Sequence, residues 1–343
     1  MRKILVYGTG NTYTQINPFI RQDKCEIIGF IESKKGKEIF EGKPVYTPEC
    51  AADNKECDFI LIASVDFEKE MTETLINMNV PKEKIIPGNL EYINIIRNPE
   101  LFDVNKYIVW QNNEIQKKQQ EIIAQNRTIL AQNRFNEMRK GVPWLTEETQ
   151  IIGGGWAVGY YYMYIMLHIL LSKKPKSILE MGLGQSSKIL INYHIDSNAD
   201  YEIIEQNEEW LSFFSQENYI PEDVKVHIRP VQKEYSAQYG TDIYTYGEIQ
   251  DIVRGKYDLI SIDGPWGSKG ISRKDILPYI PECLEDSFCI LLDDYGREGE
   301  KNMISELEKI LKDNGIEYHK RVYHGDKQFC LIVSKDNLFL CSL

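Results

Sequence analysis

SILEMGLGQSS, residues 177–187, is the stretch that decides the fold of this chain. Ser177 to Met181 is a short apolar run typical of a buried strand, and it is followed by the turn Gly182–Gly184 and a helical pattern from about Lys188. Glycines at a strand-to-helix turn let the backbone approach a ligand closely. The stretch therefore predicts an α/β fold with a ligand at the carboxyl end of this strand.

The sequence downstream continues the same alternation of strands and helices. Strands are predicted at 201–205, 225–228, 257–263 and 288–293, and helices at 271–283 and 299–312. Two further runs, 317–323 and 328–334, flank the turn-rich residues 324–327 and predict an antiparallel hairpin. We expect a mostly parallel sheet that ends in this hairpin.

Two acids accompany the glycine turn. Glu180 precedes it, and Glu205 ends the next strand at a spacing close to the roughly 20 residues at which a carboxylate meets ribose hydroxyls. A dinucleotide site would want a third glycine where this chain has Ser186 and Ser187. Upstream, the triple glycine 153–155 predicts a close approach to a ligand or a lid hinge.

The string ILEMGLGQSS resembles motif I of class I S-adenosylmethionine-dependent methyltransferases. This resemblance implies S-adenosylmethionine as the cofactor, with the glycines beneath its methionine part, Glu180 at its ammonium group and Glu205 at its ribose. The residues expected to bind the cofactor are Glu180, Gly182, Gly184, Ser186, Glu205, Asp263 and Gly155.

Three carboxylates follow two of the expected strands. Asp263 ends one strand, and Asp293 and Asp294 end the next. Because the carboxyl ends of neighbouring parallel strands meet at one edge, the three should converge, and clustered carboxylates favour a hard divalent cation. The alternative is that Asp263 contacts cofactor or substrate without metal, Asp293 caps a loop and Asp294 is solvated.

The strings SIDGPWG and LLDDYG, around these acids, resemble metal-dependent O-methyltransferases of the catechol type and antibiotic-sugar methyltransferases of the macrocin type. The resemblance implies that Asp263, Asp293 and Asp294 hold magnesium, with Asp263 and Asp294 catalytic. Trp266 stands where the catechol family carries a lysine base. Lys269, Arg273 or a metal-bound carboxylate would then have to accept the proton.

The first part of the chain predicts a second, smaller α/β domain. Short strand-like runs at 3–7, 26–31, 45–46, 59–63 and 84–86 alternate with helical stretches. Gly8 and Gly10 form a glycine turn and Glu32 ends the second strand, but the third glycine of a dinucleotide fingerprint is missing. VYGTGN, GFIES, GKPVYTPE and DFILIAS resemble the Rossmann-like domains of bacterial sugar-modifying enzymes, which implies a nucleotide or nucleotide-sugar near Gly8 and Gly10.

Residues 105–140 are rich in Gln, Asn, Glu and Lys and predict one long helix. Ile108, Ile115, Ile122 and Ile129 recur at intervals of seven, flanked by Gln and Asn. This narrow seam favours a coiled coil that makes the protein a homo-oligomer through residues 105–138, although a helix packed on a neighbouring domain of the same chain would also bury it. We therefore expect two Rossmann-like domains joined by a long helix, with boundaries at 1–98, 99–141 and 142–343.

Composition limits the possible partners. With 52 acidic against 40 basic residues and a net charge of -12, the chain should repel polyanions, so nucleic acid is not expected. No run approaches the roughly 20 apolar residues of a membrane span, and MRK at the start is not followed by a signal-peptide pattern, which predicts a cytoplasmic protein.

Together these features predict a methyltransferase that transfers a methyl group to the oxygen of a sugar, nucleotide-linked sugar or surface-glycan precursor. The substrate class comes from the resemblance alone. Two alternatives stay open: a scaffold that keeps the fold without turnover, and a nicotinamide-dependent enzyme that uses Gly8, Gly10 and Glu32.

Overall fold

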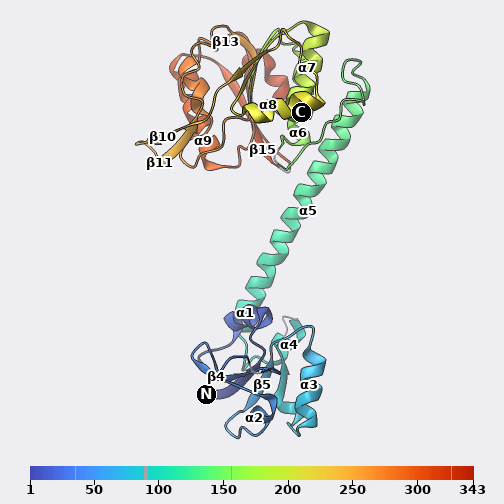
Figure 1. Ribbon diagram of the computed structural model, residues 1–343, viewed down its shortest axis with the longest axis vertical. Helices are drawn as coiled ribbons and strands as arrows, with labels where there is room; N and C mark the ends of the chain where they lie inside the picture. The colour runs from blue at the N-terminus through green and yellow to red at the C-terminus, as the bar shows by residue number, and fades with distance from the viewer. Residues whose placement is uncertain (35, 89–91, 156, 326) are drawn as a thin grey trace. The chain divides into compact units, whose positions relative to one another are not determined.

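The computed structural model describes residues 1–34, 36–88, 92–155, 157–325 and 327–343. Asp326, within the expected connection 324–327, lies outside these residues. The chain divides into two compact units, Met1–Gln119 and Gln120–Leu343, and the division falls inside helix α5 (Val104–Lys140) (Figure 1). None of the described helices combines the length and apolarity that crossing a membrane requires.

The first unit is built on a sheet with the strand order β3-β4-β2-β1-β5-β6. The strands β1 (Arg2–Tyr7), β2 (Cys25–Ile31), β4 (Lys43–Tyr46), β5 (Phe59–Ile62) and β6 (Ile85–Pro87) run parallel, and β3 (Ile39–Phe40) pairs antiparallel with β4. The parallel sheet expected from the alternating pattern is confirmed.

Helices cover both faces of this sheet. One buried cluster joins β1 to α1 (Asn11–Ile16), α4 (Tyr92–Arg97) and the start of α5, and the other joins β1 to α2 (Pro48–Ala52) and α3 (Glu68–Asn77). Short 3₁₀ turns, η1 (Asn17–Phe19) and η2 (Lys82–Lys84), complete the connections. Strands buried on both faces read as continuous apolar runs, which explains why the sequence revealed them.

The second unit contains a seven-stranded sheet with the order β14-β15-β13-β12-β7-β8-β9. Five strands are parallel: β7 (Ser177–Met181), β8 (Asp200–Glu205), β9 (Lys225–Ile228), β12 (Tyr257–Ile262) and β13 (Leu284–Leu292). At one edge, β15 (Gln328–Ser334) pairs antiparallel with both β13 and β14 (Tyr318–His324). The strand order reverses between β7 and β12, which makes a crevice at their carboxyl ends.

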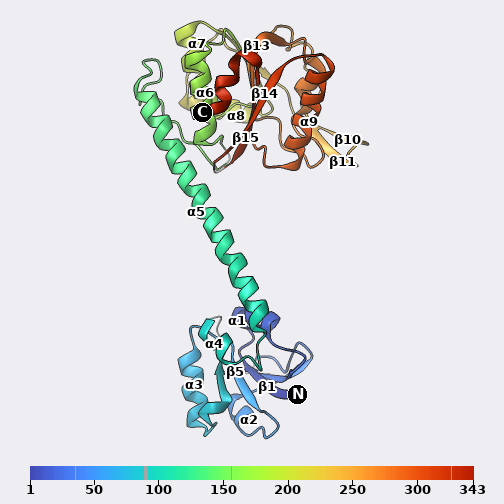
Figure 2. The ribbon, with the colours of Figure 1, turned by 180° about the vertical axis from the view of Figure 1, so that it is seen from behind.

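The second sheet is also covered on both faces. Ile178, Leu259 and Leu291 pack with α6 (Tyr160–Ser172) and α7 (Gln185–Ser197), whereas the alternate residues of the same strands pack with α9 (Glu298–Asp313) (Figure 2). Helix α8 (Glu208–Glu217) follows β8, and the 3₁₀ helix η4 (Lys335–Ser342) follows β15.

Two local predictions were wrong. The helix expected over 271–283 is only the 3₁₀ helix η3 (Lys274–Tyr279), because Pro278 and Pro281 lack the N–H groups that an α-helix needs. Strand β13 consequently begins at Leu284, earlier than residue 288. The sequence also missed a two-stranded hairpin, β10 (Gln232–Ser236) and β11 (Thr241–Thr245), whose polar, exposed residues do not show a half-buried strand pattern.

Candidate functional site

The glycine turn after β7 lies against the loop after β12. Gly182 has a φ of 104°, and a Cβ atom there would lie 2.9 Å from the Gly264 nitrogen and 3.0 Å from the Asp263 carbonyl carbon. Only glycine allows this approach of two backbones. Gly184 differs, because its φ of -168° is extended and a Cβ atom there would meet nothing within 4 Å. The space above Gly184 is therefore open.

Glu205, at the end of β8, holds this turn in place. Its carboxylate accepts hydrogen bonds from the Leu183 N–H at 2.8 Å and the Asn207 N–H at 2.9 Å, and burial raises its pKa. The indole N–H of Trp210, on α8, donates to the Leu183 carbonyl at 2.8 Å. The acid expected at the ribose thus lies directly beside the glycine turn.

Glu180 is buried behind the same turn, with only 1% of its surface exposed. The Ser186 hydroxyl donates to one carboxylate oxygen at 2.6 Å, and the Tyr201 hydroxyl donates to the other. Burial raises the pKa of Glu180 to about 7, against the opposing effect of these hydrogen bonds. The carboxyl therefore changes charge near neutral pH.

The triple glycine is tied to the start of α7. The Ile152 N–H donates to the Gln185 side-chain oxygen at 3.1 Å, next to Gly184. Gly154 and Gly155 have φ angles of 92° and 64°, and a Cβ atom on Gly153 would lie 2.7 Å from Met163. Gly154 and Gly155 thus make a turn, and Gly153 allows close packing against Met163. The hydrogen bond between Ile152 and Gln185 holds this segment next to the glycine turn after β7.

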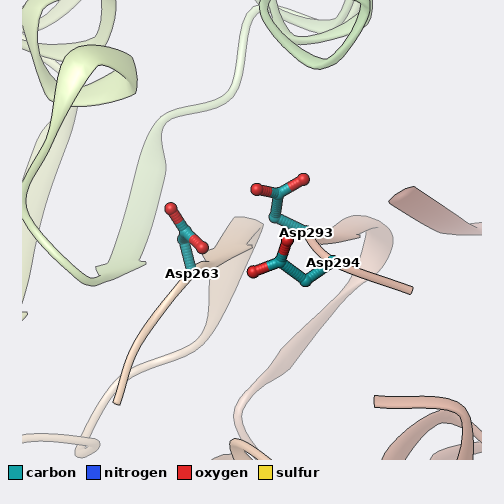
Figure 3. Close-up of side chains that lie close together, drawn as sticks. All are labelled: Asp263, Asp293 and Asp294. Atoms are coloured by element: carbon teal, nitrogen blue, oxygen red, sulfur yellow. The ribbon is translucent and has the colours of Figure 1, made fainter. Parts of the chain in front are cut away.

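The structure brings three carboxylates together at the crevice. Asp263 follows β12 and Asp293 and Asp294 follow β13, and one oxygen from each lies within 4.8 Å of the others (Figure 3). Asp293 is fully buried, and its Oδ1 has no hydrogen-bond partner in the described part of the chain. Burial and the neighbouring Asp263 raise the pKa of Asp293, and burial also raises the pKa of Asp263 against the effect of Arg273.

Three cationic side chains among the described residues surround the cluster, and of these only Arg273 was considered from the sequence, as a base. Arg273 Nη2 lies 3.0 Å from both Asp263 Oδ1 and Asp294 Oδ2, and its side chain is almost fully buried. Lys327 directly precedes β15, and its Nζ lies 3.4 Å from Asp293 Oδ2. Arg297 Nη1 lies 2.9 Å from Asp294 Oδ2. These carboxylates raise the pKa of Arg273, so of the three bases that the sequence left open, this guanidinium is the least suited to accept a proton.

The charges of this cluster nearly balance. Glu300, fully buried on α9, has neither oxygen hydrogen-bonded among the described residues, and it faces Arg297 at 3.8 Å and Arg273 at 3.9 Å. When all are ionised, four carboxylates surround three cations and leave a single negative charge. Arg297 lies three residues from both Asp294 and Glu300, whereas Arg273 and Lys327 reach the cluster from distant parts of the chain.

A hollow of about 390 Å³ lies beyond the end of β8. Trp266 at its wall is 57% exposed, its backbone N–H donates to the Gln206 side chain at 3.1 Å, and its ring lies edge-on to Tyr244. The lining residues are Gln206, Asn207, Glu208, Glu209, Val231, Lys233, Tyr244 and Trp266. Sequence reasoning missed this hollow because Tyr244 belongs to the unexpected strand β11.

Comparison with known proteins gives likenesses over parts of the chain. A family model described as C2185-like, N-terminal, matches residues 1–86. A search of curated proteins finds no match.

Solved methyltransferase structures align with part of the chain. The SAH-bound methyltransferase PaMTH1 of Podospora anserina is 15% identical, with 65% of this chain and 97% of that chain covered and a TM-score of 0.38. The Bacillus cereus O-methyltransferase in complex with SAH is 15% identical, with 59% and 91% covered and a TM-score of 0.36. Precorrin-6y C5,15-methyltransferase of Geobacter metallireducens is 13% identical, with 56% and 96% covered and a TM-score of 0.37. At these values the function has to be argued from the geometry of the site itself.

Proposed function

We propose that the second unit is an S-adenosylmethionine-dependent O-methyltransferase that acts on a sugar, a nucleotide-linked sugar or a surface-glycan precursor. One observation carries the proposal: the glycine turn after β7, Glu205 and the three aspartates all meet at the crevice where the strand order reverses. Open α/β sheets bind their ligands at such a crevice. A cofactor carrying a methyl group and an acceptor hydroxyl would therefore lie side by side.

The cofactor would be held by residues on β7, β8 and the loops after them. Its methionine part would pass over Gly184, where the backbone leaves open space, and its ribose would meet Glu205. Glu180 would face the ammonium group from behind the turn.

The three aspartates fit a divalent metal. Arg273 contacts one oxygen each of Asp263 and Asp294, and Lys327 faces the other oxygen of Asp294 at 3.6 Å. The buried Asp293 Oδ1 has no donor within the described residues. Carboxylate oxygens are the ligands that Mg²⁺ prefers, and a single excess negative charge invites a cation. Such a metal, when bound, would lower the pKa of an acceptor hydroxyl and orient it.

A carboxylate of the chain would accept the proton that the acceptor hydroxyl loses. Asp263 is the most accessible of the three, with 24% of its side chain exposed against 0% for Asp293 and 8% for Asp294. Its carboxylate is therefore the one of the three that an acceptor hydroxyl can reach most easily. As the acceptor oxygen attacks the methyl carbon, the carbon–sulfur bond breaks, sulfur keeps the electron pair and the hydroxyl proton passes to Asp263.

The acceptor class is supported by the motif resemblance and by one exposed side chain. Trp266 stands three positions after Asp263 and presents a flat apolar surface to solvent. Amphipathic rings of this kind suit ligands that offer both apolar faces and hydroxyl groups. Together with the aspartate cluster, this surface favours a hydroxyl-rich acceptor such as a sugar.

The experiment is a calorimetric titration of the whole chain with S-adenosylhomocysteine, with and without magnesium. Gly184→Val should remove binding while the protein stays folded, because its side chain would fill the open space above the turn without meeting the protein. Gly255→Val is the matched control, since a Cβ atom there also meets nothing within 4 Å. Failure of the unsubstituted protein to bind S-adenosylhomocysteine would overturn the proposal, and tight binding of NADH instead would favour a nicotinamide-dependent enzyme.

A further inference from the structure

Helix α5 carries apolar side chains that its own chain leaves exposed. Ile115, Ile122 and Ile129 are 47%, 55% and 55% exposed. The two ends of the helix differ, because Tyr107 and Phe135 are buried in the cores of the first and second units. In the part of the chain that the structure describes, residues 111–130 belong to none of the buried apolar clusters.

The spacing of these isoleucines fits a partner helix rather than a globular surface. An interval of seven, kept from Ile108 to Ile129, holds a seam in one line only if two helices wind around each other, because a straight α-helix drifts about 20° per seven residues. A helix packed on a globular core shows a wider apolar stripe. Val109, Ile123 and Leu130 are also exposed beside the isoleucines, so it is the unbroken interval of seven that calls for another helix.

Most charged residues of α5 lie away from the row of isoleucines. Counting Ile108 and its repeats as position d of a heptad, the flanking e and g positions from 109 to 132 carry one charge, Lys118. Glu114, Lys117, Glu121 and Arg127 all fall on the outer positions b, c and f. A solitary solvated helix has no reason to segregate its charges in this way, whereas two copies of α5 would meet without a row of like charges.

The polar residues beside the isoleucines select the partner and its direction. Asn112, Gln119 and Asn126 occupy position a of the same heptads. In a parallel, in-register pair each amide meets its own counterpart and can hydrogen-bond to it, while in an antiparallel pair position a packs against position d and buries amides against isoleucine. Only an identical sequence supplies the matching amide at every layer.

We infer that α5 forms a parallel, in-register, two-stranded coiled coil with α5 of a second copy of this chain. The isoleucines close the seam, and the paired amides favour the in-register arrangement at a cost in stability. This inference is independent of the proposed enzymatic activity.

The first test measures the mass of the full chain in solution by light scattering during size-exclusion chromatography. Unsubstituted protein should elute at twice the chain mass, and Ile115→Glu with Ile122→Glu should elute as a monomer with an unchanged far-ultraviolet dichroism of its folded units. Asn113→Glu with Gln120→Glu adds the same charge at outer positions and should stay dimeric. A monomeric unsubstituted protein, or a dimer that survives the seam substitutions, would overturn the inference.

The second test determines direction by oxidative cross-linking. Gln119→Cys and Asn126→Cys, made separately, should each give a disulfide-linked dimer, above the background of the protein's own cysteines and of a Gln120→Cys control. A parallel, in-register pair places each of these two positions opposite the same position of the second copy. An antiparallel pair can place a residue opposite its own counterpart only at the middle of the overlap, so at most one of the two cysteines would cross-link. Cross-linking at a single site, or a mass three times that of the chain, would contradict the two-stranded parallel form.

Discussion

At the scale of single residues, a substitution at Asp294 can test the proposed chemistry without disturbing the fold. It has a φ of 59°, which asparagine tolerates at least as well as aspartate, so Asp294→Asn should fold normally. We expect turnover to fall by about a hundredfold or more, equivalent to about 3 kcal/mol of transition-state stabilisation. S-adenosylhomocysteine affinity should stay within a few-fold.

The measurement is a methyl-transfer assay paired with calorimetric binding. Asp286→Asn is the matched control, because Asp286 is an exposed acid on β13, the strand that Asp294 follows. A fully active Asp294→Asn protein would remove this carboxylate from the mechanism.

Glu180 makes cofactor affinity depend on pH. Its pKa of about 7 means that the carboxyl is mostly neutral at pH 6 and mostly ionised at pH 8. A cationic ammonium group favours the ionised form, so affinity for S-adenosylhomocysteine should rise with pH across this interval, by at most about tenfold for one group. Titrations at pH 6, 7 and 8 measure this rise, and Glu180→Gln should flatten it. An equal slope in both proteins would mean that Glu180 does not meet the ammonium group.

At the scale of elements, the two parts of α5 should respond differently to truncation. Phe135 is fully buried against α6, so Phe135→Ala should lower the free energy of unfolding of the second unit by about 3–5 kcal/mol through the cavity it leaves. Ile129→Ala lies on the same helix but removes a half-exposed side chain, so it should leave that unit's stability nearly unchanged. Denaturant unfolding followed by tryptophan fluorescence compares the two, and equal losses would show that the seam packs on the unit itself.

Elements with a strong local signal were the ones that the sequence could predict. The parallel strands were found because burial on both faces leaves continuous apolar runs such as Ser177 to Met181. The convergence of Asp263 with Asp293 was expected from topology, since strand ends meet at one edge. Arg273 was considered only as a base and Lys327 was not considered, because their ion pairs join residues far apart in the chain and no local pattern encodes them.

At the scale of the whole molecule, the two compact units should melt as two transitions. Each has its own buried core, and multi-domain chains commonly unfold in steps. Under the proposal S-adenosylhomocysteine binds only the second unit, so it should raise the melting temperature of that unit and leave the melting temperature of the first unit unchanged. At a hundred times its dissociation constant the stabilisation is about 2.7 kcal/mol. Differential scanning calorimetry measures both, and a shift of both transitions would indicate that the units are coupled.

The position of β15 has a consequence for how the protein is made. This strand pairs with β13, yet it leaves the ribosome after β13, α9 and β14 have all been synthesised. Until residues 328–334 emerge, one edge of β13 has no partner, and an unpaired apolar edge is a template for aggregation. Lys327, which contacts the aspartate cluster, arrives with that same strand. Translation that stops early would therefore release a chain with an open sheet and an incomplete site, a natural substrate for chaperones and proteases.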